Sequence, residues 1–163
     1  HCGEALPLLR GALADELATT GGKPSNGIGE AHDSLGRCLL VQGDTRAALE
    51  AFQNAEAQFT QTLGAEDRRT LRSRIHRQWA LHVQAPTPRT LAALASSRTQ
   101  LVKVLGSEET PVIWQLDLLL DGLSGKAGTT RLSPERRRQI EQALAKEAAS
   151  PQAPRFVGLN SFS

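Results

Sequence analysis

The sequence contains no methionine, and aromatic residues make up only 4% of its 163 positions. It also lacks any apolar run near the roughly 20 residues that a membrane-spanning helix needs. Cys2 and Cys38 are the only cysteines, and neither belongs to a paired zinc-binding motif. We therefore expect no membrane span and no metal or other cofactor. Because a natural start would carry methionine, we also expect this chain to be a fragment of a longer protein.

Neither sign of charge dominates, since the formal net charge is +2. This near-neutral balance argues against a surface dedicated to nucleic acid. Two arginine-rich stretches, residues 68–77 and 136–138, stand beside acidic residues, so we interpret them as solvated helix faces. Arginine greatly outnumbers lysine, which is typical of a GC-rich bacterial genome, and we expect a cytoplasmic protein from such a source.

The remaining residues that could carry chemistry do not form a recognisable catalytic set. His76 and His82 lie about 600° apart around a helix, so they point in different directions. The glycine-rich stretches at residues 22–29 and 125–126 lack the spacing of a phosphate-binding loop. We interpret the cysteines as packed thiols; a Cys2–Cys38 disulfide is the alternative, and a cytosolic location disfavours it. We expect the chain itself not to be an enzyme.

Alanine and leucine dominate the sequence, and apolar residues recur three and four positions apart, a pattern that favours helices. The pattern predicts helices at residues 3–19, 28–42, 45–63, 67–84, 88–105, 111–123 and 133–149. Thr87, Thr110 and Ser133 each precede a proline, which is typical of a helix start. Gly64 and Gly106 stand where helices commonly end.

Residues 34–57 contain the strongest local signal, two helical runs separated by a Gly-Asp break. Gly36 in the first run would let a partner helix approach closely, and large Phe52 lies between small alanines in the second run. The sequence therefore predicts a tightly packed helix hairpin. Its expected core consists of Leu35, Gly36, Leu39, Ala48, Phe52 and Ala55.

This hairpin recurs at an offset of 42 residues, since Leu63-Gly64 is matched by Leu105-Gly106 and Val41-Gln42 by Val83-Gln84. The hairpin resembles a tetratricopeptide repeat, and its length resembles the longer repeats of the kinesin-light-chain type rather than the ordinary repeat of about 34 residues. The resemblance implies an all-α, right-handed superhelix of stacked hairpins at about 28–64, 67–106 and 111–149, preceded by a half-repeat at 3–19. Residues 150–163 would form a docked tail.

The resemblance also implies which residues line a concave groove, because the first helix of each hairpin forms the inner surface of such repeats. The expected groove residues are Glu30, Asp33, Arg37, Leu40, Arg72, Ile75, Trp79, His82, Trp114, Asp117 and Asp121. The register around Trp79 stays open. The same alignment puts Arg74 and Arg77 in the core, whereas a shift of one residue buries Ile75 and Trp79 instead.

Repeats of this kind mostly bind other proteins, so the resemblance implies reversible binding of a peptide or helix of mixed charge. Asp33 would repel a C-terminal carboxylate, which argues against that class of ligand. The alternative is a regulatory or self-association domain of a multidomain bacterial serine/threonine kinase or transcription regulator. We expect no nucleic-acid or membrane partner.

Overall fold

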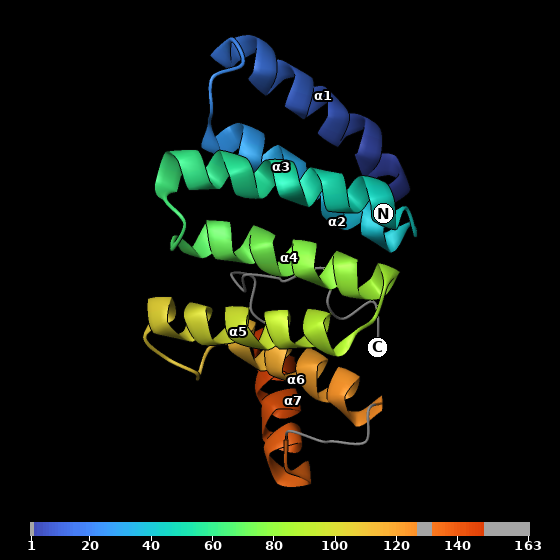
Figure 1. The fold of residues 1–163 in the computed structure, drawn as a ribbon, viewed down its shortest axis with the longest axis vertical. Coiled ribbons are helices and arrows are strands. Elements are labelled where there is room, and N and C mark those ends of the chain that lie inside the picture. The colour runs from blue at the N-terminus through green and yellow to red at the C-terminus, as the bar shows by residue number, and fades with distance from the viewer. Residues whose placement is uncertain (1, 127–131, 149–163) are drawn as a thin grey trace. The chain divides into compact units, whose positions relative to one another are not determined.

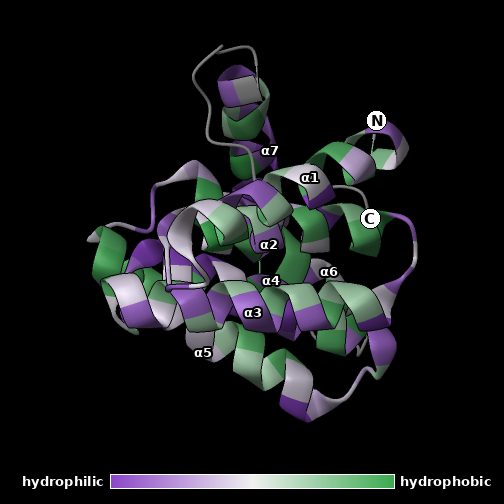
Figure 2. Ribbon diagram, turned by 90° about the horizontal axis from the view of Figure 1, so that it is seen from above, coloured by the Kyte–Doolittle hydropathy of each residue, from purple (hydrophilic) through white to green (hydrophobic). Residues whose placement is uncertain are grey.

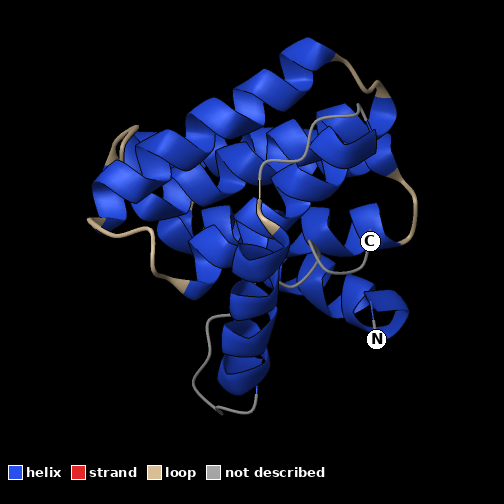
Figure 3. Cartoon of the chain, turned by 90° about the horizontal axis from the view of Figure 1, so that it is seen from below, coloured by secondary structure: helices blue, strands red, loops and turns tan. Residues whose placement is uncertain are grey.

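A computed structural model describes residues 2–126 and 132–148 of the chain, and these residues form helices and no strand (Figure 3). The all-α prediction is therefore confirmed. The expected docked tail at residues 150–163 lies outside the described residues. The helices are α1 (Cys2–Thr20), α2 (Asn26–Val41), α3 (Thr45–Leu63), α4 (Arg68–Gln84), α5 (Pro88–Leu105), α6 (Pro111–Lys126) and α7 (Pro134–Ala148). None of these helices is long and apolar enough to cross a membrane.

Side-chain caps stand at most helix starts, and those predicted at Thr87, Thr110 and Ser133 are confirmed, whereas α2 begins two residues before its predicted start. Ser25 Oγ accepts a hydrogen bond from Ile28 N at the start of α2, and Asp44 caps α3 in the same way. The hydroxyls of Thr87, Thr110 and Ser133 likewise accept backbone hydrogen bonds at the starts of α5, α6 and α7. These caps satisfy amide groups that have no partner inside the helix.

The chain divides into two compact units, residues 1–100 and 101–163. In the first unit, α2 packs against α1 and α3, and α4 packs against α3 and also touches α2. Figure 1 shows these helices lying roughly side by side, with α3 in front of α2. The ribbon of α3 alternates between polar and apolar colours in Figure 2, as expected for a helix with one buried face. In the second unit, α6 packs against α7.

Two glycines of α2 determine how closely α3 approaches it. A Cβ atom added to Gly36 would lie 2.6 Å from the Phe52 ring, and one added to Gly29 would lie 2.8 Å from the Phe59 ring. Both rings are fully buried. The glycines are seven residues apart and so are the phenylalanines, so the same contact occurs twice along the antiparallel pair. The prediction that Gly36 is needed for close packing is confirmed.

The other predicted core residues are buried, with one exception. Leu39, Ala48, Phe52 and Ala55 have almost no exposed surface, whereas Leu35 is only partly buried. The core therefore forms along the α2–α3 seam, and Leu35 is the least buried of the predicted core residues.

A disulfide bond joins Cys2 of α1 to Cys38 of α2, with the two Cα atoms 5.1 Å apart. The expectation of packed free thiols is therefore wrong. The cysteines meet because α1 and α2 run antiparallel. At the opposite end of the pair, the Glu16 carboxylate lies within 2.7 Å of where a Gly27 Cβ would be. Spacing along the sequence could not reveal this pairing, which depends on how the two helices pack.

Candidate functional site

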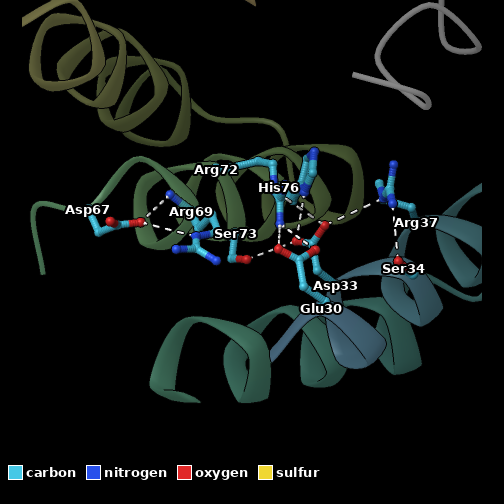
Figure 4. A network of polar contacts seen from close by, with 9 residues as sticks. All are labelled: Glu30, Asp33, Ser34, Arg37, Asp67, Arg69, Arg72, Ser73 and His76. Carbon is cyan, nitrogen blue, oxygen red and sulfur yellow. Dashed lines mark hydrogen bonds and ion pairs between the residues drawn. The ribbon is translucent and has the colours of Figure 1, made fainter. Parts of the chain in front are cut away.

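The candidate site is a network of charged and polar side chains between α2 and α4 (Figure 4). We call it the α2–α4 network. Glu30, Asp33, Ser34 and Arg37 project from α2, while Arg72, Ser73 and His76 project from α4. These residues recur three or four positions apart on each helix, so each set occupies one helical face. The two faces meet because α2 and α4 both pack against α3.

Asp33 is the centre of the α2–α4 network and is fully buried. Its Oδ1 accepts a hydrogen bond from Ser73 Oγ at 2.9 Å, and His76 Nδ1 lies 2.9 Å from the same oxygen. Because an ionised carboxylate only accepts hydrogen bonds, His76 Nδ1 carries the hydrogen. The second oxygen, Oδ2, lies 3.4 Å from Arg37 Nε and 3.7 Å from Arg72 Nε.

These neighbours decide the charge of Asp33. Burial alone would raise the pKa of the Asp33 carboxyl group, because burial disfavours the ionised form. The His76, Arg72 and Arg37 side chains outweigh burial and hold the pKa of Asp33 well below its usual value. Asp33 is therefore a buried carboxylate anion at neutral pH, which is stable only because it is paired and hydrogen-bonded.

The outer edge of the α2–α4 network is partly exposed. Arg72 Nη2 lies 2.9 and 2.8 Å from the two carboxylate oxygens of Glu30, and Arg37 Nη2 donates to Ser34 Oγ at 3.2 Å. The side chains of Arg37 and Arg72 are each 29% exposed, and that of Glu30 is 43% exposed. A partner could reach these three residues, whereas Asp33 behind them is covered.

The phenylalanines of α3 connect this network to the core. The Arg72 guanidinium lies 5.9 Å from the centre of the Phe59 ring, and the His76 ring centre lies 5.2 Å from that of Phe52. Each ring thus contacts a glycine of α2 and a nitrogen-containing side chain of α4. Arg72 and His76 are positioned by the apolar core as well as by Asp33.

A second ion-pair cluster explains the other arginines of α4. Glu56 of α3 lies 2.8 Å from Arg74 Nε and 2.6 Å from Arg77 Nε. Burial alone would raise the pKa of Glu56, but the hydrogen bonds from Arg77 and Arg74 outweigh it and lower the pKa. The interpretation of this stretch as a solvated helix face is incomplete for these arginines: both are partly exposed, but α3 also supplies a carboxylate that neutralises part of their charge.

The sequence left two registers possible for the helix around Trp79. The structure has the one shifted by a residue, in which Ile75 and Trp79 face the interior. Ile75 and Trp79 are buried, and Arg74 and Arg77 are partly exposed and paired with Glu56. The physical reason is the high cost of burying an unpaired guanidinium group, which this register avoids. Ile75 and Trp79 therefore belong to the interior and do not face a groove.

Other predicted groove residues are also covered. Leu40 is buried in α2, and His82 is nearly buried, with its Nδ1 atom 2.6 Å from Thr90 Oγ1 of α5. Burial lowers the pKa of His82, which favours the neutral ring. These side chains stabilise the packing of their helices, so within residues 1–100 the partly exposed members of the predicted groove are Glu30, Arg37 and Arg72.

Two of the predicted groove residues of the second unit, Trp114 and Asp121, make polar contacts within that unit. Asp121 is buried, accepts a hydrogen bond from Leu132 N at 2.8 Å and pairs with Arg137 of α7. Trp114 Nε1 donates to Glu109 Oε2 at 3.2 Å, and Asp117 is partly exposed. Asp121 thus ties α7 to α6 and is not available as an acidic groove residue.

The sequence interpretation missed Ser73, His76 and Glu56. A signal for the first two existed, because they lie 40 and 43 residues after Asp33, close to the 42-residue offset. An offset of 42 residues by itself aligns Asp33 with Ile75. The partners of Asp33 are Ser73 and His76, which lie on either side of Ile75 in the sequence and reach across to α2. Glu56 gave no comparable signal.

Among the described residues, no group of three or more histidine, cysteine or acidic side chains could hold a metal ion. Comparison with known proteins adds no assignment, since the sequence matches no protein-family model and no curated protein.

Proposed function

We propose that this chain is a tetratricopeptide-like repeat domain that binds a peptide or helix of another protein. The helix contacts of the first unit are those that stacked hairpins make: α2 packs on its own partner α3 and on the preceding α1, and α3 also packs on α4. Glu30 and Arg72 are separated by 42 residues and form an ion pair, so equivalent positions of the proposed repeat are neighbours.

The single observation that carries the binding proposal is the partly exposed edge of the α2–α4 network. Arg37, Arg72 and Glu30 come from two adjacent helices and present two positive charges and one negative charge. Such an edge favours a partner segment that carries both an acidic and a basic side chain. Arg is well suited to this role, because its planar guanidinium group can donate several hydrogen bonds to a carboxylate.

We expect this binding to be weak and reversible. Arg72 is already paired with Glu30, and Arg37 with Asp33 and Ser34, so a partner must replace contacts that exist in the unbound protein. The gain from exchanging one partly exposed ion pair for another is of the order of 1 kcal/mol or less. Additional apolar contacts from the partner would have to supply the remaining affinity.

Affinity capture from a bacterial lysate, followed by chemical cross-linking and mass spectrometry, tests the proposal. Three full-length chains are compared: the wild type, Arg37→Gln and the matched control Arg46→Gln. Arg46 is an exposed residue of α3, so its substitution removes the same charge at another surface. All three chains must be folded at the temperature of the comparison, which thermal unfolding checks, and Arg37→Gln should have the lowest midpoint because Arg37 pairs with Asp33.

We expect the wild type and Arg46→Gln to retain a partner that cross-links to α2 or α4, and Arg37→Gln to retain much less of it. Equal retention by all three chains would contradict binding at the α2–α4 edge. Retention only of copies of this chain would favour self-association, the function class expected of a regulatory domain in a larger protein.

We propose a cytoplasmic location as part of the same account, since protein-binding repeats of this type would meet their partners there. Thiol reductants of the cytoplasm would then act on the Cys2–Cys38 disulfide. Mass spectrometry of the protein after rapid thiol alkylation in cells measures the oxidised fraction. A fully oxidised protein would point instead to an oxidising compartment.

A further inference from the structure

The Cys2–Cys38 disulfide holds a helix that otherwise has few strong attachments. Leu6 is the one buried residue of α1, and Leu9 and Leu13 are only partly buried. Within the described part of the chain, no side-chain hydrogen bond or ion pair joins α1 to another helix, whereas several join α2 to α4. The disulfide is therefore the strongest link between α1 and the rest of its unit.

The connection after α1 can act as a hinge. Gly21 and Gly22 have φ angles of 61° and 78°, and a Cβ atom at either position would meet nothing within 4 Å. Glycine adopts such angles without the strain that other residues suffer. The segment that follows is short and ends at Ser25, the cap of α2. Helix α1 could thus move as a body about these glycines without disturbing α2.

Helix α1 is also a weak helix by itself. Pro7 lies in its interior, where it cannot donate the usual backbone hydrogen bond, and Gly11 lowers helix stability by about 1 kcal/mol relative to alanine. Most of the stability of a helix in a protein comes from tertiary packing, and α1 buries few of its residues. If α1 lost its attachment to α2, it would therefore unfold or sample many positions.

Detachment of α1 would uncover one stripe of α2. Gly27 and Cys38 both contact α1, and Ala31 and Ser34 lie between them at helical spacing on the same face. This stripe contains neither Asp33 nor Glu30, and it shares only Ser34 with the α2–α4 network. Detachment would thus change one surface of the unit while the glycine–phenylalanine seam and the contacts of Asp33 and Glu30 with α4 stay intact.

We propose that the Cys2–Cys38 disulfide is a redox-controlled latch that keeps α1 docked on α2 when oxidised and releases it when reduced. The reductant belongs to the class of thiols and dithiols. A reductant thiolate attacks Cys2 Sγ, because Cys2 is the more exposed of the two cysteines. The bond between the cysteine sulfurs breaks, and the Cys38 thiolate leaves and takes up a proton.

A second reductant thiolate then attacks the reductant sulfur of the mixed disulfide that this step left on Cys2. The Cys2 thiol is released and protonated, and the two reductant sulfurs are joined as a disulfide. Two electrons pass from the reductant to the protein in total. Oxidation by a small disulfide such as oxidised glutathione runs the same exchange in reverse. Disulfides in reducing compartments are usually transient and redox-sensing, which agrees with such a role.

Hydrogen exchange measured by mass spectrometry on the full chain tests the latch. The wild type is examined oxidised and after treatment with a phosphine reductant, beside a Cys2→Ser/Cys38→Ser double variant under both conditions. We expect reduction to accelerate exchange of the α1 amides by about tenfold or more, while amides of α3 and α4 change by less than about twofold. Reoxidation with oxidised glutathione should restore the slow exchange.

The double variant should resemble the reduced wild type and should not respond to the reductant. Unchanged α1 exchange on reduction of the wild type would overturn the proposal, because α1 would then stay docked without the disulfide. Equal acceleration in α1, α3 and α4 would also overturn it, since the disulfide would then stabilise the whole unit. The wild-type measurement needs no substitution, so poor folding of the variant cannot hide the result.

Discussion

Substitution of Gly36 by alanine is predicted to destabilise the first unit, although alanine normally favours a helix. The added Cβ atom would lie 2.6, 2.7 and 3.1 Å from three atoms of the Phe52 ring. Real Cβ contacts almost never fall below 3.0 Å. The ring cannot move away easily, because Phe52 is fully buried between α2 and His76. The helices must therefore separate or the ring must adopt a strained rotamer.

The expected magnitude follows from two opposing terms. Overpacking of a core costs about 1–3 kcal/mol, and the higher helix propensity of alanine returns up to about 1 kcal/mol. We therefore expect a net loss of about 1–2 kcal/mol in the free energy of unfolding. For a unit of this size, such a loss lowers the thermal midpoint by roughly 5–15 °C.

Chemical denaturation followed by far-ultraviolet circular dichroism measures this change, and Gly11→Ala is the matched control. Gly11 also lies inside a helix, but nothing lies within 4 Å of a Cβ added there. Gly11→Ala should raise stability by up to about 1 kcal/mol. In the double variant Gly36→Ala/Phe52→Leu, the two losses should not add, because the smaller side chain relieves the overlap. If Gly36→Ala stabilised the protein as Gly11→Ala does, the proposed packing of α2 on α3 would be refuted.

Three further predictions concern the polar groups. The pKa of Asp33 is lowered in the folded state, so the stabilising effect of its carboxylate is complete above the unfolded pKa of about 3.9 and is lost as the pH falls through the folded value. Asp33→Asn should therefore flatten the fall in unfolding free energy below about pH 4 and should cost about 3–5 kcal/mol at neutral pH. An unchanged acid profile would count against the buried anion. Glu56→Gln should lower the free energy of unfolding by about 1 kcal/mol, because it weakens the bonds to Arg74 and Arg77. The exposed control Glu66→Gln should have almost no effect in the same denaturation assay. Equal effects of the two substitutions would contradict the ion-pair cluster around Glu56. Asp121→Asn should accelerate hydrogen exchange in α7, because Asp121 binds Arg137 and Leu132 N, and unchanged exchange there would show that this contact does not hold α7.

The helices were predictable because their signals are local. The hydroxyl–proline pairs, the glycine stops and the three-to-four spacing of apolar residues each act within one or two turns. The role of Gly36 could also be inferred, since a glycine inside an apolar helix face has few explanations other than close approach. The site was less accessible to prediction, because it depends on rotation of α4 about its axis. A shift of one residue exchanges Ile75 and Trp79 for Arg74 and Arg77, and only packing against Glu56 and the core selects between them.

The disulfide and the buried carboxylate show the same limit. Cys2 and Cys38 are 36 residues apart, and their contact follows from the antiparallel packing of α1 on α2. Asp33 was expected at a groove surface because its position in the repeat resembles a groove position. In the structure, Ser73 and His76 cover Asp33, so the charge of the proposed groove comes from the more exposed Arg37, Arg72 and Glu30.

The measurement that tests the central claim most directly is a double-mutant cycle between Asp33 of α2 and His76 of α4. The claim is that equivalent faces of these two helices meet and together form the proposed binding edge. The single variants Asp33→Asn and His76→Gln and the double variant are compared by equilibrium unfolding. The account predicts a coupling energy of about 1–3 kcal/mol, as found for residues in direct contact within a polar network. Additive effects within about 0.5 kcal/mol would mean that the two side chains do not touch, and the α2–α4 edge would not exist.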